Sequence, residues 1–137
     1  MTQYKEIEQL IPHRAPFLFI DEITSIKDNK ITGHRTFDRS EQTLTGEDHK
    51  FVPAVIVLES MVQCGGAGVK KMGLTEGLFG LAHIENADFF EEVHFGQKVH
   101  YEVVNYKVTS KYVKQTGKAY VDDKLILEAT WLCVRLE

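Results

Sequence analysis

A single acidic side chain, Glu59, lies in the mostly apolar stretch of residues 51–71, FVPAVIVLESMVQCGGAGVKK. A charge in apolar surroundings is costly unless it is paired or neutralised, so this position favours a chemical role for the carboxyl. Apolar neighbours also favour the protonated form, which a general acid needs at neutral pH. The alternative is a structural carboxylate whose partners are backbone donors or an arginine such as Arg14.

Two further side chains near Glu59 could take part in chemistry. Gln63 follows four residues later, and this spacing puts its amide on the same helix face, where it can orient the carboxyl. The polar segment at residues 46–49, GEDH, ends in a histidine, the side chain most often used as a general base. His49 is therefore a candidate catalytic residue, and the alternative is a solvated loop histidine beside Asp48.

The element that must position Glu59 is a helix, which we expect over residues 55–71. Pro53 precedes it, and its apolar positions cover more than one face, which is typical of a buried helix. Gly65, Gly66 and Gly68 are poor helix formers, so they either admit a neighbouring backbone or end the helix early.

The remaining pattern is mostly that of strands. A short helix is expected over residues 4–10 and strands over 17–26 and 31–37, followed by a polar loop at 38–50. The last half is rich in β-branched and aromatic residues, and it predicts strands at 79–90, 98–107, 112–121 and 124–135, with a tight turn at Asp122-Asp123. The sum predicts an α+β fold, in which an antiparallel sheet of about six strands wraps around a long central helix.

Composition limits the class of protein. A chain of 137 residues is the size of one domain, which we expect to span 1–137. A net charge of −4 argues against nucleic-acid binding, and no apolar run reaches the ~20 residues that span a bilayer. Cys64 and Cys133 have no metal or redox spacing, and the N-terminus has no signal-peptide pattern. We therefore expect a cytoplasmic protein with reduced thiols, no metal, no nucleic-acid partner and no membrane span.

Four motifs, in order, resemble one known family. They are PHRAPFLFID at residues 12–21, PAVIVLESMVQ at 53–63, VHFGQKV at 93–99 and the hairpin from Gly117 to Ala129. The corresponding family patterns are PHR-x-PFLL-x-D, P-G-V-L-x-x-E-A-M-A-Q, V-x-P-G-D-x-L and a last hairpin. The chain thus resembles the hot-dog-fold 3-hydroxyacyl-[acyl-carrier-protein] dehydratases of the FabZ/FabA type over nearly its whole length.

This resemblance implies how the site would work. The family forms a homodimer in which two sheets join edge to edge, and each interface site takes a loop histidine from one subunit and a helix glutamate from the other. The acyl chain, carried on the phosphopantetheine arm of acyl carrier protein, lies in an apolar tunnel, and neither metal nor redox cofactor is expected. In this chain Glu59 would be the acid, while the amide of Ala54 or Val55 would polarise the thioester carbonyl. His13 would have structural and interface roles.

The chain departs from the family at the histidine loop. The family pattern G-H-F-P-x-x-P-x-x-P has histidine directly after glycine, whereas this loop is two residues shorter and has Glu47 after Gly46. His49 lies three residues after Gly46 and would need a different loop path. Ala54 also replaces the glycine that follows Pro53, and its methyl group could crowd the thioester.

Four functions remain open from the sequence. The first is an active homodimeric dehydratase that uses Glu59 and His49. The second is an incomplete subunit that gives Glu59 to a related, histidine-bearing dehydratase subunit in a heterodimer; either assembly could form a trimer of dimers. The third is a hot-dog acyl thioesterase whose helix carboxylate activates water. The fourth is a non-catalytic acyl-binding or scaffolding protein.

Overall fold

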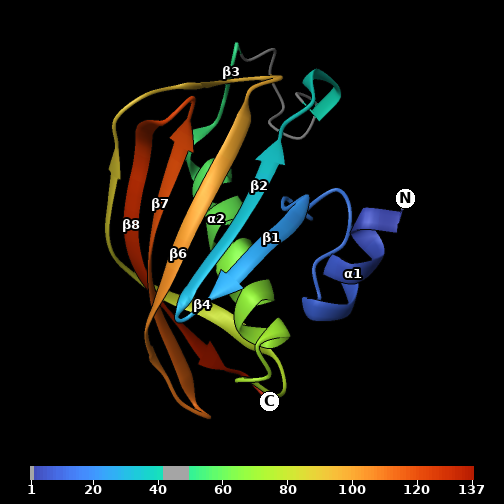
Figure 1. Ribbon diagram of the computed structural model, residues 1–137, viewed down its shortest axis with the longest axis vertical. Coiled ribbons are helices and arrows are strands. Elements are labelled where there is room, and N and C mark those ends of the chain that lie inside the picture. Colours follow the sequence, from blue (N-terminus) through green and yellow to red (C-terminus); the bar gives the residue numbers. More distant parts are fainter. Residues whose placement is uncertain (1, 42–49) are drawn as a thin grey trace.

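A six-stranded antiparallel sheet wraps around one long helix (Figure 1). The computed structural model describes residues 2–41 and 50–137. The strand order is β1-β2-β6-β7-β8-β4, and β3 and β5 form a separate two-stranded sheet. The bounds are α1 Thr2–Leu10, β1 Glu22–Lys27, β2 Lys30–Thr36, β3 Phe51–Val52, α2 Ala54–Lys71, β4 Phe79–Phe89, β5 Val93–His94, β6 Lys98–Val108, β7 Tyr112–Val121 and β8 Lys124–Arg135. The predicted α+β architecture is confirmed.

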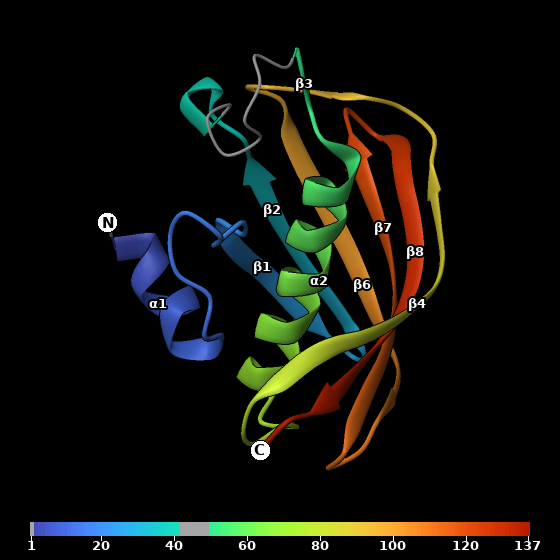
Figure 2. The ribbon, with the colours of Figure 1, turned by 180° about the vertical axis from the view of Figure 1, so that it is seen from behind.

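Helix α2 lies along the concave face of the sheet, and α1 lies beyond the β1 edge (Figure 2). Two glycines allow α2 to approach the sheet this closely. A Cβ atom on Gly68 would lie 2.4 Å from Ile31 Cγ2, and one on Gly65 would lie 2.3 Å from Gln115 Oε1. The glycines therefore admit neighbouring side chains, not a neighbouring backbone, and the expectation that they end the helix early is wrong.

The predicted strand at residues 17–26 is also wrong in its first half, because β1 begins only at Glu22. Pro16 has no amide hydrogen, and the backbone of the next residues pairs with side chains of α2. Gln63 Oε1 accepts from the Phe19 amide at 2.7 Å, and Ser60 Oγ donates to the Phe19 carbonyl at 2.6 Å. Residues 17–21 thus run against α2 as an irregular segment.

The hairpin between β7 and β8 follows the sequence prediction. Asp122 and Asp123 have φ values of 50° and 66°, the left-handed conformation that a tight two-residue hairpin turn needs. Within the described part of the chain, no helix combines the length and the hydrophobicity that a membrane crossing requires.

Strand β4 is one edge of the sheet, and β8 is its only partner strand in the described part of the chain. Its apolar side chains Leu81, Ile84 and Phe89 are 41%, 39% and 45% exposed. A long edge strand with exposed apolar side chains is a surface that can pair with another strand. This edge matters for the site because both of the main cavities reach it.

Candidate active site

The Glu59 carboxyl is held by the amide of Gln63, as the four-residue spacing predicts. Gln63 Nε2 donates to Glu59 Oε2 at 2.9 Å. The amide is fixed in turn by the segment before β1, because its Oε1 accepts from the Phe19 amide at 2.7 Å and its Nε2 donates to the Phe17 carbonyl at 2.9 Å. Gln63 is buried, so its orientation is set by three hydrogen bonds.

This network distinguishes the two oxygens of Glu59. Since Gln63 Oε1 must accept from the Phe19 amide, its Nε2 must face Glu59 as a donor. Oε2 of Glu59 is therefore an acceptor. When the carboxyl is protonated, its hydrogen sits on Oε1, the oxygen that is left to act on a ligand.

Glu59 lines a cavity of about 130 Å³ between α2 and the start of β4. The carboxyl is not buried as the sequence suggested, because the Glu59 side chain is 34% exposed and Val55, one turn earlier in the helix, is 66% exposed. The lining is mostly apolar and includes Ile11, Val62, Val69, Leu78, Phe79 and Leu81. This cavity can place an alkyl chain beside the carboxyl.

Two other groups in this cavity contact or face Glu59. His13 Nε2 lies 3.6 Å from Glu59 Oε2, whereas Arg14, the expected structural partner, instead donates to backbone carbonyls of Ile11 and His13. Burial, and then the Glu59 charge, raise the pKa of the Cys133 thiol to about 11. The Cys133 thiol is therefore uncharged near pH 7, so it lines the cavity and does not act as a nucleophile.

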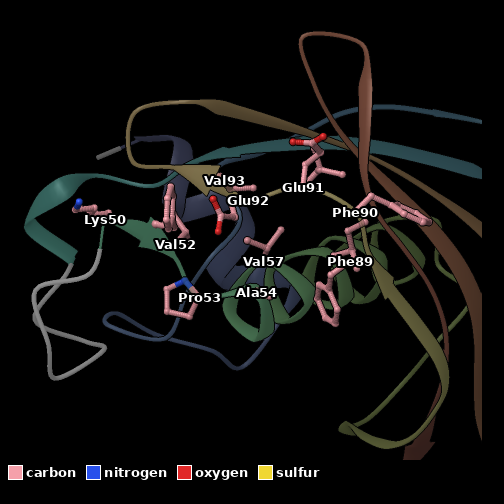
Figure 3. A pocket seen from close by; sticks show the side chains of 13 residues that line it. Lys50, Val52, Pro53, Ala54, Val57, Phe89, Phe90, Glu91, Glu92 and Val93 are labelled. Carbon is pink, nitrogen blue, oxygen red and sulfur yellow. The ribbon is translucent and has the colours of Figure 1, made fainter.

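A larger cavity of about 640 Å³ lies at the N-terminus of α2 (Figure 3). Ala54 and Val57 of the helix line it together with Phe89 and Phe90 at the end of β4. The amides of Ile56 and Val57 both donate to the Pro53 carbonyl, at 2.9 and 3.2 Å. The amides of Ala54 and Val55 have no acceptor among residues 2–41 and 50–137, which leaves them for a ligand oxygen.

The large cavity carries acidic groups at its rim. Glu91 and Glu92 line it, and Glu91 pairs with Lys124 at 2.7 Å. Lys50 is a cationic group of the same lining. Among the residues with a described placement, no three His, Cys, Asp or Glu side chains are arranged to hold a metal ion.

Among residues 2–41 and 50–137 of one chain, the two cavities share no lining residue. Glu59 and Gln63 are thus together in one cavity, and Ala54 is in the other. His49 lies outside the described residues. The sequence interpretation missed the placement of His13 beside Glu59, and its only signal was the PHR segment to which His13 belongs.

Comparison with known proteins decides the family. The model of the FabA-like domain matches residues 11–130. The chain belongs to the FabA-like family. This confirms the resemblance drawn from the four motifs.

Relatives from within this family are similar over almost their full length. The chain is 36% identical to the 3-hydroxyacyl-[acyl-carrier-protein] dehydratase FabZ of Aliarcobacter butzleri, over 94% of each chain. It is also 36% identical to the FabZ of Fusobacterium nucleatum, over 98% of this chain and 97% of that protein.

Among solved structures, the dehydratase heterocomplex ApeI:P from Xenorhabdus doucetiae has a chain that superposes with a TM-score of 0.82. That match covers 96% of this chain and 91% of the other at 14% sequence identity, so it shows a shared fold. The fold of this FabA-like chain is the hot-dog fold.

Proposed function

We propose that this chain acts in the cytoplasm as a single hot-dog domain that dehydrates 3-hydroxyacyl thioesters, carried on acyl carrier protein, to trans-2-enoyl thioesters in fatty-acid or related acyl synthesis. Support comes from the FabZ relatives and from a carboxyl that Gln63 holds in a fixed orientation beside an apolar cavity. The reaction breaks the Cα–H and Cβ–O bonds and releases one water molecule.

Each proposed group has one task in this elimination. A base takes the proton from Cα, and the electron pair of that bond forms the Cα=Cβ double bond as the hydroxyl leaves. Glu59 gives the proton on Oε1 to the departing hydroxyl, which becomes water. The amides of Ala54 and Val55 at the start of α2 stabilise the negative charge that develops on the thioester oxygen. His49 is the candidate base.

The separation of the two cavities supports a site made by two chains. The small cavity with Glu59 reaches the Phe79 end of β4, and the large cavity with the start of α2 reaches the Phe89 end. Ile84 lies at the middle of the strand. If two β4 edges pair antiparallel about a two-fold axis near Ile84, the Phe79 end of each strand meets the Phe89 end of its mate.

This pairing joins the Glu59 cavity of one chain to the α2 N-terminus of the other. It also covers the exposed apolar side chains of β4. We therefore propose a dimer with two composite sites as the working form, and acyl carrier protein as the partner that delivers the substrate.

A heterodimer with a related dehydratase subunit is a second candidate, because the histidine loop is two residues shorter than the family pattern. In that assembly this chain would give Glu59 to the companion's site, and the companion would supply the histidine. One solved neighbour of the same fold is itself described as a dehydratase heterocomplex.

The first test is hydration of a short trans-2-enoyl thioester by the purified protein, followed as loss of the enoyl absorbance. Glu59→Gln keeps the shape of the side chain and removes the acid, so we expect a rate loss on the order of 10²-fold or more. The control, Glu102→Gln, removes an exposed carboxyl that pairs with Lys30 on the outer face of the sheet. Full activity in Glu59→Gln would remove Glu59 from the mechanism.

A mixing experiment separates the two assemblies. Glu59→Gln and His49→Ala chains are each expected to be inactive as homodimers. After unfolding and refolding together they should regain about a quarter of wild-type activity, because half of the dimers are mixed and each has one intact site of two. Inactivity of the wild type alone, with activity on adding a histidine-bearing partner, would favour the heterodimer.

A further inference from the structure

His13 lies beside the candidate acid, although it comes from a different part of the chain. Its Nε2 is 3.6 Å from Glu59 Oε2, and both side chains line the 130 Å³ cavity. Of the residues that the structure describes, the other titratable groups lining this cavity are Lys70 and Cys133. His13 belongs to the segment between α1 and β1, and so it is independent of the loop that carries His49.

The burial of the imidazole indicates which nitrogen carries the proton. Nδ1 of His13 is buried and has no hydrogen-bond partner in the described part of the chain. A buried N–H without an acceptor is costly, so the neutral ring places its hydrogen on Nε2. The Glu59 oxygen that lies 3.6 Å from this nitrogen is Oε2, the same oxygen that accepts from Gln63.

The backbone around His13 is held in place from both sides. The Ile11 amide donates to the Ile7 carbonyl at 3.1 Å, and Ile11 is buried in the core. Arg14 Nη1 donates to the carbonyls of Ile11 and His13, at 3.0 and 2.7 Å. The ring therefore projects from a fixed backbone segment, from which it can add a second contact to the carboxyl that Gln63 already holds.

We propose that His13 is a positioning residue for Glu59, which donates from Nε2 to Oε2 and so keeps Oε1 directed at the substrate. This inference rests on the proposed dehydratase function. The 3.6 Å separation must shorten by about 0.6–0.9 Å to make a hydrogen bond. We expect this shortening when substrate binds, because catalytic hydrogen bonds are often long in its absence.

The kinetic test compares His13→Ala, His13→Gln and the control His100→Gln, which changes a histidine outside both cavities. Loss of the donor should lower kcat about 10- to 100-fold with little change in KM, since a small misplacement of a catalytic group has effects of this size. The amide of His13→Gln reaches the position of Nε2 and should restore most of kcat. Wild-type kcat in His13→Ala, or equal loss in both His13 variants, would overturn the proposal.

A second measurement does not depend on activity. The measurement is NMR of protein with ¹⁵N-labelled histidine, in which the His13 signals are assigned by their loss in His13→Gln. These signals should show that the neutral ring carries its hydrogen on Nε2. Glu59→Gln should shift the Nε2 signal, and an unchanged signal would overturn the contact. If the wild type has no dehydratase activity, either alone or with a histidine-bearing partner, but the signal shifts, the proposed function fails and the His13–Glu59 contact stands.

Discussion

Replacement of Gln63 by leucine should damage both the fold and the site, because this amide links α2 to the segment before β1. The change removes an acceptor from the Phe19 amide and donors from the Phe17 carbonyl and Glu59 Oε2. Leucine has a similar size, so the perturbation is chiefly the loss of these three hydrogen bonds.

The magnitude follows from what each partner loses. The Phe19 amide is buried, and leaving it without an acceptor costs about 1–3 kcal/mol. Loss of the bonds to Phe17 and Glu59, both partly solvated, adds about 1 kcal/mol. A total of about 2–4 kcal/mol in a chain of 137 residues corresponds to a fall in Tm of about 7–14 °C. The freed Glu59 carboxyl should also lower kcat by on the order of 10-fold.

The assay is thermal unfolding by circular dichroism, together with hydration of an enoyl thioester. Gln63→Glu is the matched control, since it keeps an acceptor for the Phe19 amide but sets a second carboxyl against Glu59. In the folded variant the two neighbouring carboxyls should share one proton, because both cannot easily be charged at once. The unfolded chain releases this proton at lower pH. Its stability should therefore approach wild type at low pH and decline as the pH rises.

Two outcomes would refute this reasoning. An unchanged Tm in Gln63→Leu would mean that the Phe19 amide does not depend on the side chain of Gln63. Wild-type kcat in a folded Gln63→Leu protein would mean that Glu59 needs no orientation by the amide.

Two further predictions concern packing and the cavity wall. Gly68→Ala should destabilise the protein by about 1–3 kcal/mol, because its methyl group would meet Ile31 at 2.4 Å. A Cβ atom on Gly66 would lie 3.8 Å from Ile11 Cγ2, so Gly66→Ala should stabilise the protein by about 0.5–1 kcal/mol in thermal unfolding. Equal changes in stability for the two variants would contradict the packing argument. Alkylation of Cys133, followed by mass spectrometry, should be slow at pH 8 and accelerate toward a pKa of about 11. Glu59→Gln should lower the pKa of Cys133 and speed alkylation at a given pH. An unchanged dependence of the alkylation rate on pH would mean that the Glu59 charge does not act on Cys133.

The sequence alone determined the elements whose signals are local. The β7–β8 hairpin has its exact predicted bounds at Tyr112–Val121 and Lys124–Arg135, because alternating residues flank a two-aspartate turn. The Glu59–Gln63 hydrogen bond was also predictable, since residues four apart share a helix face.

Tertiary structure decided where distant segments meet. Residues 17–21 read as a strand from their composition, yet their backbone pairs with Gln63 and Ser60, which are more than 40 positions away. A sequence pattern reports propensity and periodicity, but it does not report which side chains will satisfy a backbone group.

The same limit applies to the site. No local pattern links His13 to Glu59, because the pair forms only when the segment after α1 packs against α2. Nor did the sequence separate Ala54 from Glu59, which are five positions apart and yet line different cavities. A helix turns by about 100° per residue, so its side chains point in different directions and line different cavities. Only the folded chain shows which cavity each side chain lines.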